Sequence, residues 1–175
     1  MRLFVAVAPP PDVLADVDAA LGAVRGLQPE LRWIPRERWH LTLAFYGEVP
    51  DASLAGVADM VGERLSRGPD GPLELFFAGA GQFARRAMWV GVDGEVDQLR
   101  RLAKAVNTDR RPYRAHLTVA RLRGGHDASP VVAAMTSYAG PRWRVGAVHL
   151  VRSFLGPQPR YETVRSWPVA SGQDG

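Results

Sequence analysis

The feature that most constrains the fold is a short segment that occurs twice. Residues 40–45 read HLTLAF and residues 116–121 read HLTVAR, in a chain of 175 residues that has four histidines. Both segments are rich in strand-forming residues, and a helical pattern follows each of them. This repeat predicts a weak internal duplication of roughly half the chain, with one copy of the segment in each half.

Hydrophobic periodicity and turn residues predict a mixed order of strands and helices. We expect strands at 2–8, 31–35, 39–49, 73–83, 87–93, 113–122, 142–155 and 160–169, and helices at 11–27, 50–68, 95–106 and 129–140. Ser129 is expected to cap the last helix, with Pro130 at its first position. Strands and helices are interspersed, with hairpins as well as crossovers. The pattern therefore indicates a single α+β domain over residues 1–175, with largely antiparallel sheets.

Alternation along a strand determines which side chains of each segment lie together. Residues i and i+2 of a strand point to one face, so His40 and Thr42 share a face, and His116 and Thr118 repeat the arrangement. The aliphatic residues between them face the opposite way and can pack under helices. The same alternation places Arg121 on the face opposite His116 unless the strand bends, although close enough to line the mouth of a cleft.

Two imidazoles and two hydroxyls suit the cleavage of a phosphodiester. A neutral imidazole removes a proton from the attacking hydroxyl or water, and a protonated one gives a proton to the leaving oxygen. Threonine hydroxyls can hold the non-bridging phosphate oxygens. A zinc site is the main alternative, but neither segment contains a His-x-x-x-His pair or an acidic residue. We therefore expect no metal and no other cofactor. The two remaining histidines, His126 and His149, are expected to be a turn residue and a structural residue.

Charge and composition set the class of partner. The chain has a formal net charge of +4, and 21 of its 22 basic residues are arginine, which favours an anionic partner because guanidinium groups bind phosphate bidentately. A genome rich in G and C explains the same composition equally well. Four arginines could form a basic rim (Arg85, Arg86, Arg114 and Arg123). Arginines are also in excess around the second segment, with Arg110 and Arg111 before it, which favours longer RNA over a mononucleotide.

Location is predicted from what the chain lacks. It contains no cysteine, its first apolar run is too short for a signal peptide, and no run reaches the length of a membrane span. We expect a cytoplasmic protein that does not bind membranes.

The paired segments resemble the two His-x-Thr motifs of the two-histidine phosphoesterases. More narrowly, the chain is similar to the RNA 2′,3′-cyclic phosphodiesterases, also called 2′-5′ RNA ligases of the LigT type. The likeness extends over nearly the whole chain. It includes MRLFVAVAPP at residues 1–10, HLTLAFYGEV at 40–49 and VHLVRSFLGPQPRYETVRSWPV at 148–169. Tyr46 stands where the family often carries leucine.

The resemblance implies two pseudo-symmetric lobes of mostly antiparallel sheet with outer helices, and a central cleft between them. It implies that His40 is the proton donor and His116 the proton acceptor, and that Thr42 and Thr118 bind phosphate. Further candidate contacts to RNA or phosphate are Phe45, Arg114 and Arg121.

The implied reaction is metal-independent hydrolysis of a terminal RNA 2′,3′-cyclic phosphate to a 2′-phosphomonoester, with 2′-5′ ligation in some members. We expect a monomer whose partner is RNA with this end. Two alternatives stay open: a phosphodiesterase for a small cyclic nucleotide, and a module that binds RNA or nucleotides without chemistry.

Overall fold

The computed structural model describes residues 1–84, 86–109, 111–156 and 159–169. The strands are β1 (Arg2–Val7), β2 (Arg32–Trp33), β3 (Leu41–Glu48), β4 (Glu74–Phe83), β5 (Ala87–Gly94), β6 (His116–Arg121), β7 (Trp143–Arg144), β8 (Ala147–Phe154) and β9 (Arg160–Pro168). The α-helices are α1 (Pro11–Gly22), α2 (Leu54–Ser66), α3 (Val96–Val106) and α4 (Ser129–Ala134). Single 3-10 turns occur at η1 (Arg25–Leu27), η2 (Arg36–Arg38) and η3 (Asp51–Ser53).

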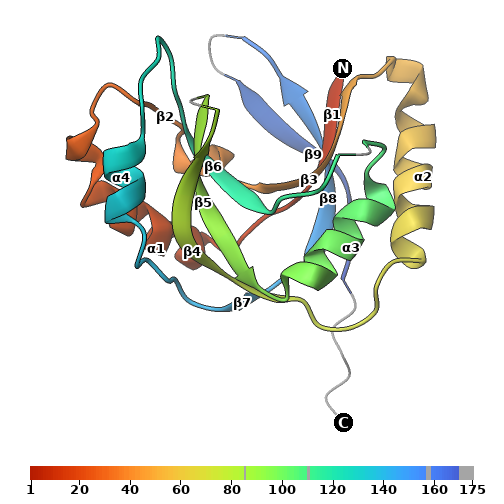
Figure 1. Cartoon of the computed structure of the whole chain (residues 1–175). Helices are drawn as coiled ribbons and strands as arrows, with labels where there is room; N and C mark the ends of the chain where they lie inside the picture. The colour runs from red at the N-terminus through yellow and green to blue at the C-terminus, as the bar shows by residue number, and fades with distance from the viewer. Residues whose placement is uncertain (85, 110, 157–158, 170–175) are drawn as a thin grey trace.

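The strands form two antiparallel sheets, one in each lobe. One sheet has the order β3-β1-β8-β9 and the other β2-β6-β5-β4-β7. Each lobe carries helices on its outer side: α2 and α3 pack on the four-stranded sheet, and α1 and α4 lie beside the five-stranded one (Figure 1). The expected α+β class with mostly antiparallel sheets is therefore confirmed.

The two lobes repeat one pattern. In each repeat a first strand is followed by a helix, then by the strand with the His-x-Thr segment, then by a second helix: β1-α1-β3-α2 and β5-α3-β6-α4. The His-x-Thr strand pairs with the first strand of its repeat, as β3 does with β1 and β6 with β5. The segments β3-β1-β8 and β6-β5-β4 thus correspond, which agrees with the expected duplication.

The first helix of each repeat crosses to the other lobe. Helix α1 follows β1 but lies with the five-stranded sheet, and α3 follows β5 but packs on β3 of the four-stranded sheet (Figure 1). Tyr46 of β3 secures the second crossing, because its hydroxyl donates to the carbonyl of Val106 at the end of α3 over 2.7 Å. The departure from the family pattern at Tyr46 thus has a structural role here.

Three of the expected elements have other bounds in the structure than the sequence predicts. The strand expected at 142–155 is two strands in different sheets, since β7 pairs with β4 whereas β8 pairs with β1 and β9, and the chain changes sheet at 145–146. The helix expected at 11–27 ends at Gly22 and continues as a turn and η1. The helix expected at 129–140 ends at Ala134. The predicted cap is wrong, because Ser129 is the first helical residue and its backbone N–H donates to Asp127.

The core is continuous between the lobes. Buried aliphatic and aromatic residues of both sheets and of α1, α2, α3 and α4 form one packed cluster. The aliphatic residues of the repeated segments belong to it, with Leu41, Leu43, Leu117 and Val119 each at most 1% exposed. Among the described residues, no helix combines the length and the apolar character that a membrane crossing needs.

Candidate active site

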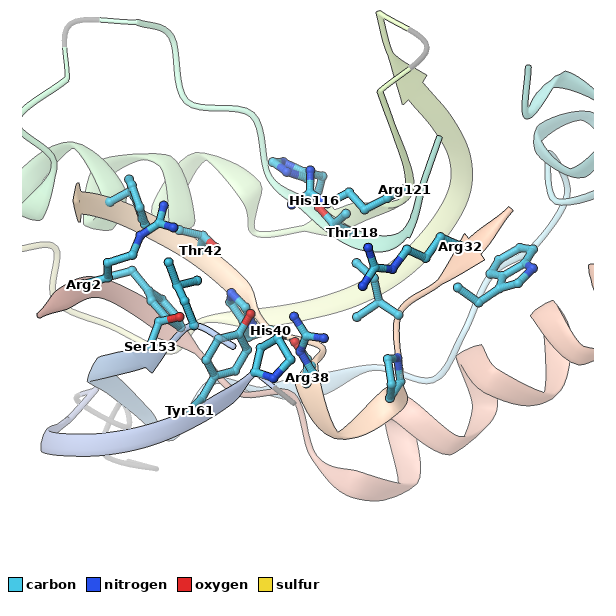
Figure 2. A pocket seen from close by; sticks show the side chains of 17 residues that line it. Arg2, Arg32, Arg38, His40, Thr42, His116, Thr118, Arg121, Ser153 and Tyr161 are labelled. Atoms are coloured by element: carbon cyan, nitrogen blue, oxygen red, sulfur yellow. Dashed lines mark hydrogen bonds between the residues drawn. The ribbon is translucent and has the colours of Figure 1, made fainter. Parts of the chain in front are cut away.

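Both His-x-Thr segments line one cavity between the lobes. The cavity has a volume of about 620 Å³, and His40, Thr42, His116 and Thr118 all border it. The two pairs approach from opposite sides, His40 and Thr42 with the four-stranded sheet and His116 and Thr118 with the five-stranded one (Figure 2). The remaining lining residues are Arg2, Phe4, Arg32, Trp33, Ile34, Pro35, Arg38, Phe45, Arg121, Ser153, Leu155, Pro159 and Tyr161.

A β-bulge follows the threonine in each segment. One step along β1, from Val5 to Ala6, corresponds to two steps along β3, from Ala44 to Thr42. Residues 43 and 44 of β3 therefore both face the core, where they are 1% and 2% exposed. The extra residue reverses the alternation, so that Phe45 returns to the face of Thr42 and lines the cavity.

The second segment contains the same bulge. One step along β5, from Met88 to Trp89, corresponds to two steps along β6, from Ala120 to Thr118. The residues at 119 and 120 are both buried, and Arg121 turns to the face of Thr118 and lines the cavity. Strict alternation would place Arg121 on the face opposite His116, and this bulge is the bend in the strand that reverses the alternation.

Backbone carbonyls hold both imidazoles through the same nitrogen. Nδ1 of His40 lies 2.9 Å from the carbonyl oxygen of Arg38, and Nδ1 of His116 lies 2.7 Å from that of Arg114. A carbonyl only accepts, so Nδ1 carries the proton in each ring. The neutral ring therefore presents the lone pair of Nε2, and the protonated ring presents an N–H there. Either ring can act as base or acid through Nε2.

Aromatic rings pack around each imidazole, and the guanidinium group of an arginine lies over one of these aromatic rings. His40 stacks on Phe4 at 4.7 Å between ring centroids and meets the edge of Tyr161 at 5.2 Å. The guanidinium of Arg38 lies 5.6 Å from the centre of the Tyr161 ring. These contacts restrict rotation of the His40 ring.

The second imidazole has a matching set of neighbours. His116 meets the ring of Phe83 at 4.9 Å, and the guanidinium of Arg114 lies 5.8 Å from that ring. Phe83 is the last residue of β4, which ends in the segment GAGQF. Gly81 of this segment faces Trp89, and a Cβ there would lie 2.3 Å from the indole ring. Glycine at 81 thus makes room for Trp89, which packs beside Phe83.

Burial and nearby cations favour the neutral form of both rings. Burial is the main factor that lowers the pKa of His40 below the ordinary value of 6.5, and the charges of Arg38 and of a protonated His116 add to it. Burial likewise lowers the pKa of His116, helped by Arg121 and Arg114. The carbonyl hydrogen bonds act in the opposite direction. Both rings are therefore neutral near pH 7 in the free protein.

The other predicted residues are placed as follows. Arg114 is exposed beside Phe83 and does not line the cavity. Arg86 and Arg123 are exposed, Arg111 pairs with Asp109, and Arg85 and Arg110 lie outside the described residues. His126 is exposed after a turn, and Nδ1 of His149 lies 2.7 Å from the hydroxyl oxygen of Ser166.

Several residues that build the cavity were not singled out from the sequence. Arg2 opens β1, whereas Arg32, Arg38 and Trp39 belong to the segment that runs from β2 to the start of β3. The indole of Trp39 donates to the carbonyl of Ile34 over 2.9 Å and closes the turn that places Arg38 and His40. The sequence did contain a feature that points to Arg38. An arginine lies two positions before the histidine of each His-x-Thr segment, Arg38 before His40 and Arg114 before His116.

Within the part of the chain that the structure describes, histidines and acidic residues form no group of three or more that could hold a metal ion.

The sequence resembles those of known proteins. The family model of the 2′-5′ RNA ligase superfamily matches residues 9–155, and the chain belongs to this family. A Geobacillus stearothermophilus protein named RNA 2′,3′-cyclic phosphodiesterase is 31% identical over 84% of this chain, which spans half the length of that relative. An Archaeoglobus fulgidus protein of the same name is also 31% identical, over 94% of this chain and 98% of its own length.

Solved structures agree with the fold. The chain is 26% identical to TT0787 of Thermus thermophilus, with a TM-score of 0.73 over 99% of this chain and 100% of that one. The structure of E. coli LigT in complex with ATP is 25% identical, with a TM-score of 0.74 over 97% and 98% of the two chains. The likeness therefore extends over both lobes.

Proposed function

We propose that the protein hydrolyses a terminal 2′,3′-cyclic phosphate of RNA to a 2′-phosphomonoester. One observation carries the proposal: two imidazoles, each anchored through Nδ1 and each beside a threonine, present Nε2 to one cavity. A site that only binds a ligand does not need two proton-transfer groups. The relatives named RNA 2′,3′-cyclic phosphodiesterase support this choice of substrate.

The proposed reaction divides two proton transfers between the lobes. His116 accepts a proton from water as the water oxygen attacks phosphorus. His40 donates a proton to O3′ of the ribose as the P–O3′ bond breaks, and the phosphate stays on O2′. The hydroxyls of Thr42 and Thr118 donate to the non-bridging oxygens and hold the phosphate in line.

Substrate binding supplies the acid in its protonated form. In the free protein burial keeps the pKa of both rings low, so that neither is charged near neutral pH. A cyclic phosphate carries one negative charge, and this charge favours a protonated imidazole next to it. Repulsion between the rings lets one proton enter more readily than two, which is the state that acid–base catalysis requires.

The chemistry of the described residues accounts for both proton transfers without a metal ion, and metal independence is therefore part of the proposal. Ligation uses the same geometry when the 5′-hydroxyl of a second RNA replaces water as the nucleophile. That hydroxyl then attacks the cyclic phosphate, O3′ leaves, and a 2′-5′ linkage forms. We further propose a monomer in the cytoplasm, with both lobes in one domain over residues 1–175.

A turnover assay on an oligonucleotide with a 2′,3′-cyclic phosphate end tests the proposal. We expect the wild type to release the 2′-phosphomonoester end, and His40→Ala and His116→Ala each to lose about 10²–10⁴ in rate. His149→Ala and His126→Ala are matched controls, because neither ring lines the cavity. Both controls should retain activity.

The same assay separates the alternatives. Turnover of a cyclic mononucleotide without turnover of the oligonucleotide would favour the small-nucleotide enzyme. Tight binding of the oligonucleotide without turnover would identify a module that only binds.

A further inference from the structure

The proposed reaction assigns the ribose of the substrate to one lobe. In an in-line displacement the attacking and the leaving oxygen lie on opposite sides of phosphorus. His116 activates the water from the five-stranded sheet, so O3′ leaves toward His40 on the four-stranded sheet (Figure 2). O3′ belongs to the ribose of the terminal nucleotide, and the RNA chain continues from the 5′-oxygen of that ribose. The upstream RNA therefore begins on the side of the four-stranded sheet.

Exposed apolar side chains border the cavity on this side. Among the described residues, four large apolar or aromatic side chains are exposed, and three of these line the cavity: Phe45 at 51%, Leu155 at 66% and Tyr161 at 36%. Phe45 belongs to β3, whereas Leu155 and Tyr161 belong to the β8–β9 hairpin. Exposed apolar groups at the border of a cavity suit contact with a ribose and a base.

The two faces of the β8–β9 hairpin carry different side chains. Ser153 and Tyr161 are direct partners, and both line the cavity. Arg152 and Phe154 flank Ser153 in β8 and therefore point to the opposite face, and Arg160 is the direct partner of Phe154. The outer face of the hairpin thus lies directly behind this wall of the cavity.

Phe154 holds two guanidinium groups on the outer face. Cζ of Arg152 lies 4.6 Å from the centroid of the Phe154 ring, and Cζ of Arg160 lies 4.1 Å from it. Neither arginine forms an ion pair with a described carboxylate, although Glu162 is the direct partner of Arg152. A guanidinium that already lies over a ring has less rotamer freedom to lose, which lowers the cost of contacting a phosphate.

Charge distinguishes the hairpin from the other edge of the same sheet. Beside β3, the exposed carboxylates of Glu48 and Asp51 each lie 3.6 Å from the N-terminal amino group, and Glu48 also lies 3.7 Å from Arg2. The cations at that edge are therefore already paired with carboxylates. Arg152 and Arg160 are available to an external polyanion, so RNA that leaves the cavity is attracted to the hairpin.

We propose that the outer face of the β8–β9 hairpin, with Arg152, Phe154 and Arg160, binds the RNA chain upstream of the cyclic phosphate end. The inference rests on the proposed function, because the direction of the chain follows from the roles of His40 and His116. The two guanidinium groups contact successive phosphates of single-stranded RNA. This face adds affinity only for RNA that is long enough to pass over the hairpin, whereas a mononucleotide occupies the cavity alone.

A binding measurement tests the surface without turnover. Calorimetric titration compares uridine 2′-phosphate with uridine oligomers of up to about eight nucleotides that end in the same 2′-phosphate. Wild-type affinity should rise with length. The double variant Arg152→Gln/Arg160→Gln should keep its affinity for uridine 2′-phosphate and lose about tenfold or more for the longest oligomer. The slope of its log affinity against log salt should fall by about 1.4, since each contact contributes about 0.7 for single strands.

Two further variants refine the assignment. Phe154→Leu should lose part of the gain with length, because both guanidinium groups lose the ring beneath them. Arg142→Gln is the matched control: its guanidinium also lies over a ring, 4.7 Å from the centroid of Phe76, but it belongs to the five-stranded lobe and pairs with Glu74 over 3.2 Å. Its affinities should equal those of the wild type at every length.

The outcomes separate this inference from the proposed function. An unchanged affinity and salt slope for the longest oligomer in the double variant would overturn the RNA surface, even if the cyclic end is hydrolysed. An equal loss for uridine 2′-phosphate and for the longest oligomer would also overturn it, because the two arginines would then act on the cavity or the fold. If no cyclic end is hydrolysed but the loss grows with length, the proposed function fails and the RNA surface stands.

Discussion

A substrate whose leaving group needs no proton should restore the activity of a variant that lacks the His40 ring. The proposed acid protonates O3′ of ribose, and a ribose alkoxide leaves poorly without that proton. A nitrophenolate leaves well as an anion. His40→Ala should therefore be impaired on a cyclic phosphate end but not on a nitrophenyl phosphodiester.

The structure identifies the ring nitrogen whose loss matters, and general acid–base catalysis gives the size of the expected loss. Nε2 is the nitrogen of the ring that is available for the proposed proton transfer, because Nδ1 is bound to the carbonyl of Arg38 at 2.9 Å. Removal of a general acid costs about 10²–10⁴ in rate, which corresponds to about 3–5 kcal/mol of transition-state stabilisation. On the nitrophenyl substrate the loss should stay within about tenfold, since no proton is needed. His116→Ala should lose about 10²–10⁴ on both substrates, because water must still be activated.

The assay compares kcat/KM of each variant on the two substrates. His40→Phe is a useful second variant, because it keeps a ring between Phe4 and Tyr161 without a titratable nitrogen, and it should behave like His40→Ala. His149→Ala controls for loss of a histidine elsewhere in the same sheet. Rescue of His116→Ala instead of His40→Ala would exchange the two roles. Rescue of neither would refute a simple division between acid and base.

Three further predictions concern metal, salt and pH. Turnover should be unchanged in EDTA, and a loss that zinc or manganese restores would contradict metal independence. Longer RNA should bind more tightly than a mononucleotide, with a slope of log affinity against log salt of about 0.7 for each phosphate contact, and equal affinity at low salt would mean that Arg114 and Arg123 are only solvated. Burial lowers the pKa of His40 and of His116 in the free protein. Both limbs of the kcat/KM profile should therefore lie below pH 6.5, and the alkaline limb of the kcat profile should lie higher because the bound phosphate favours protonation. A kcat/KM optimum above pH 7 would contradict the burial of the rings.

The face of a strand to which a side chain points could be predicted from the sequence, because local periodicity determines it. Alternation on a strand is a property of the backbone, so the shared face of His40 and Thr42, and that of His116 and Thr118, followed from spacing alone. The α+β class followed from the order of the elements. Both expectations depend on neighbours within a few residues.

Contacts between distant segments could not be predicted in this way. Tyr161 reaches His40 from β9, and Phe83 reaches His116 from β4. Arg32 enters the cavity because the two-residue strand β2 pairs with β6, which is far away in the sequence. The register of that pairing depends on packing across the sheet, and single-sequence periodicity does not report it.

The two bulges show why the sixth residue of each segment was harder to place than the first three. Val119 and Ala120 are both apolar, as are Leu43 and Ala44, so each pair can face the core together. The extra residue then rotates the strand and brings Arg121 or Phe45 to the cavity. Each lobe thereby presents a third side chain beside its histidine and threonine, and the two differ: a cation on one side and an aromatic ring on the other. The duplicated backbone thus supplies equivalent proton-transfer groups, whereas the sixth residue makes the two walls of the cavity chemically distinct.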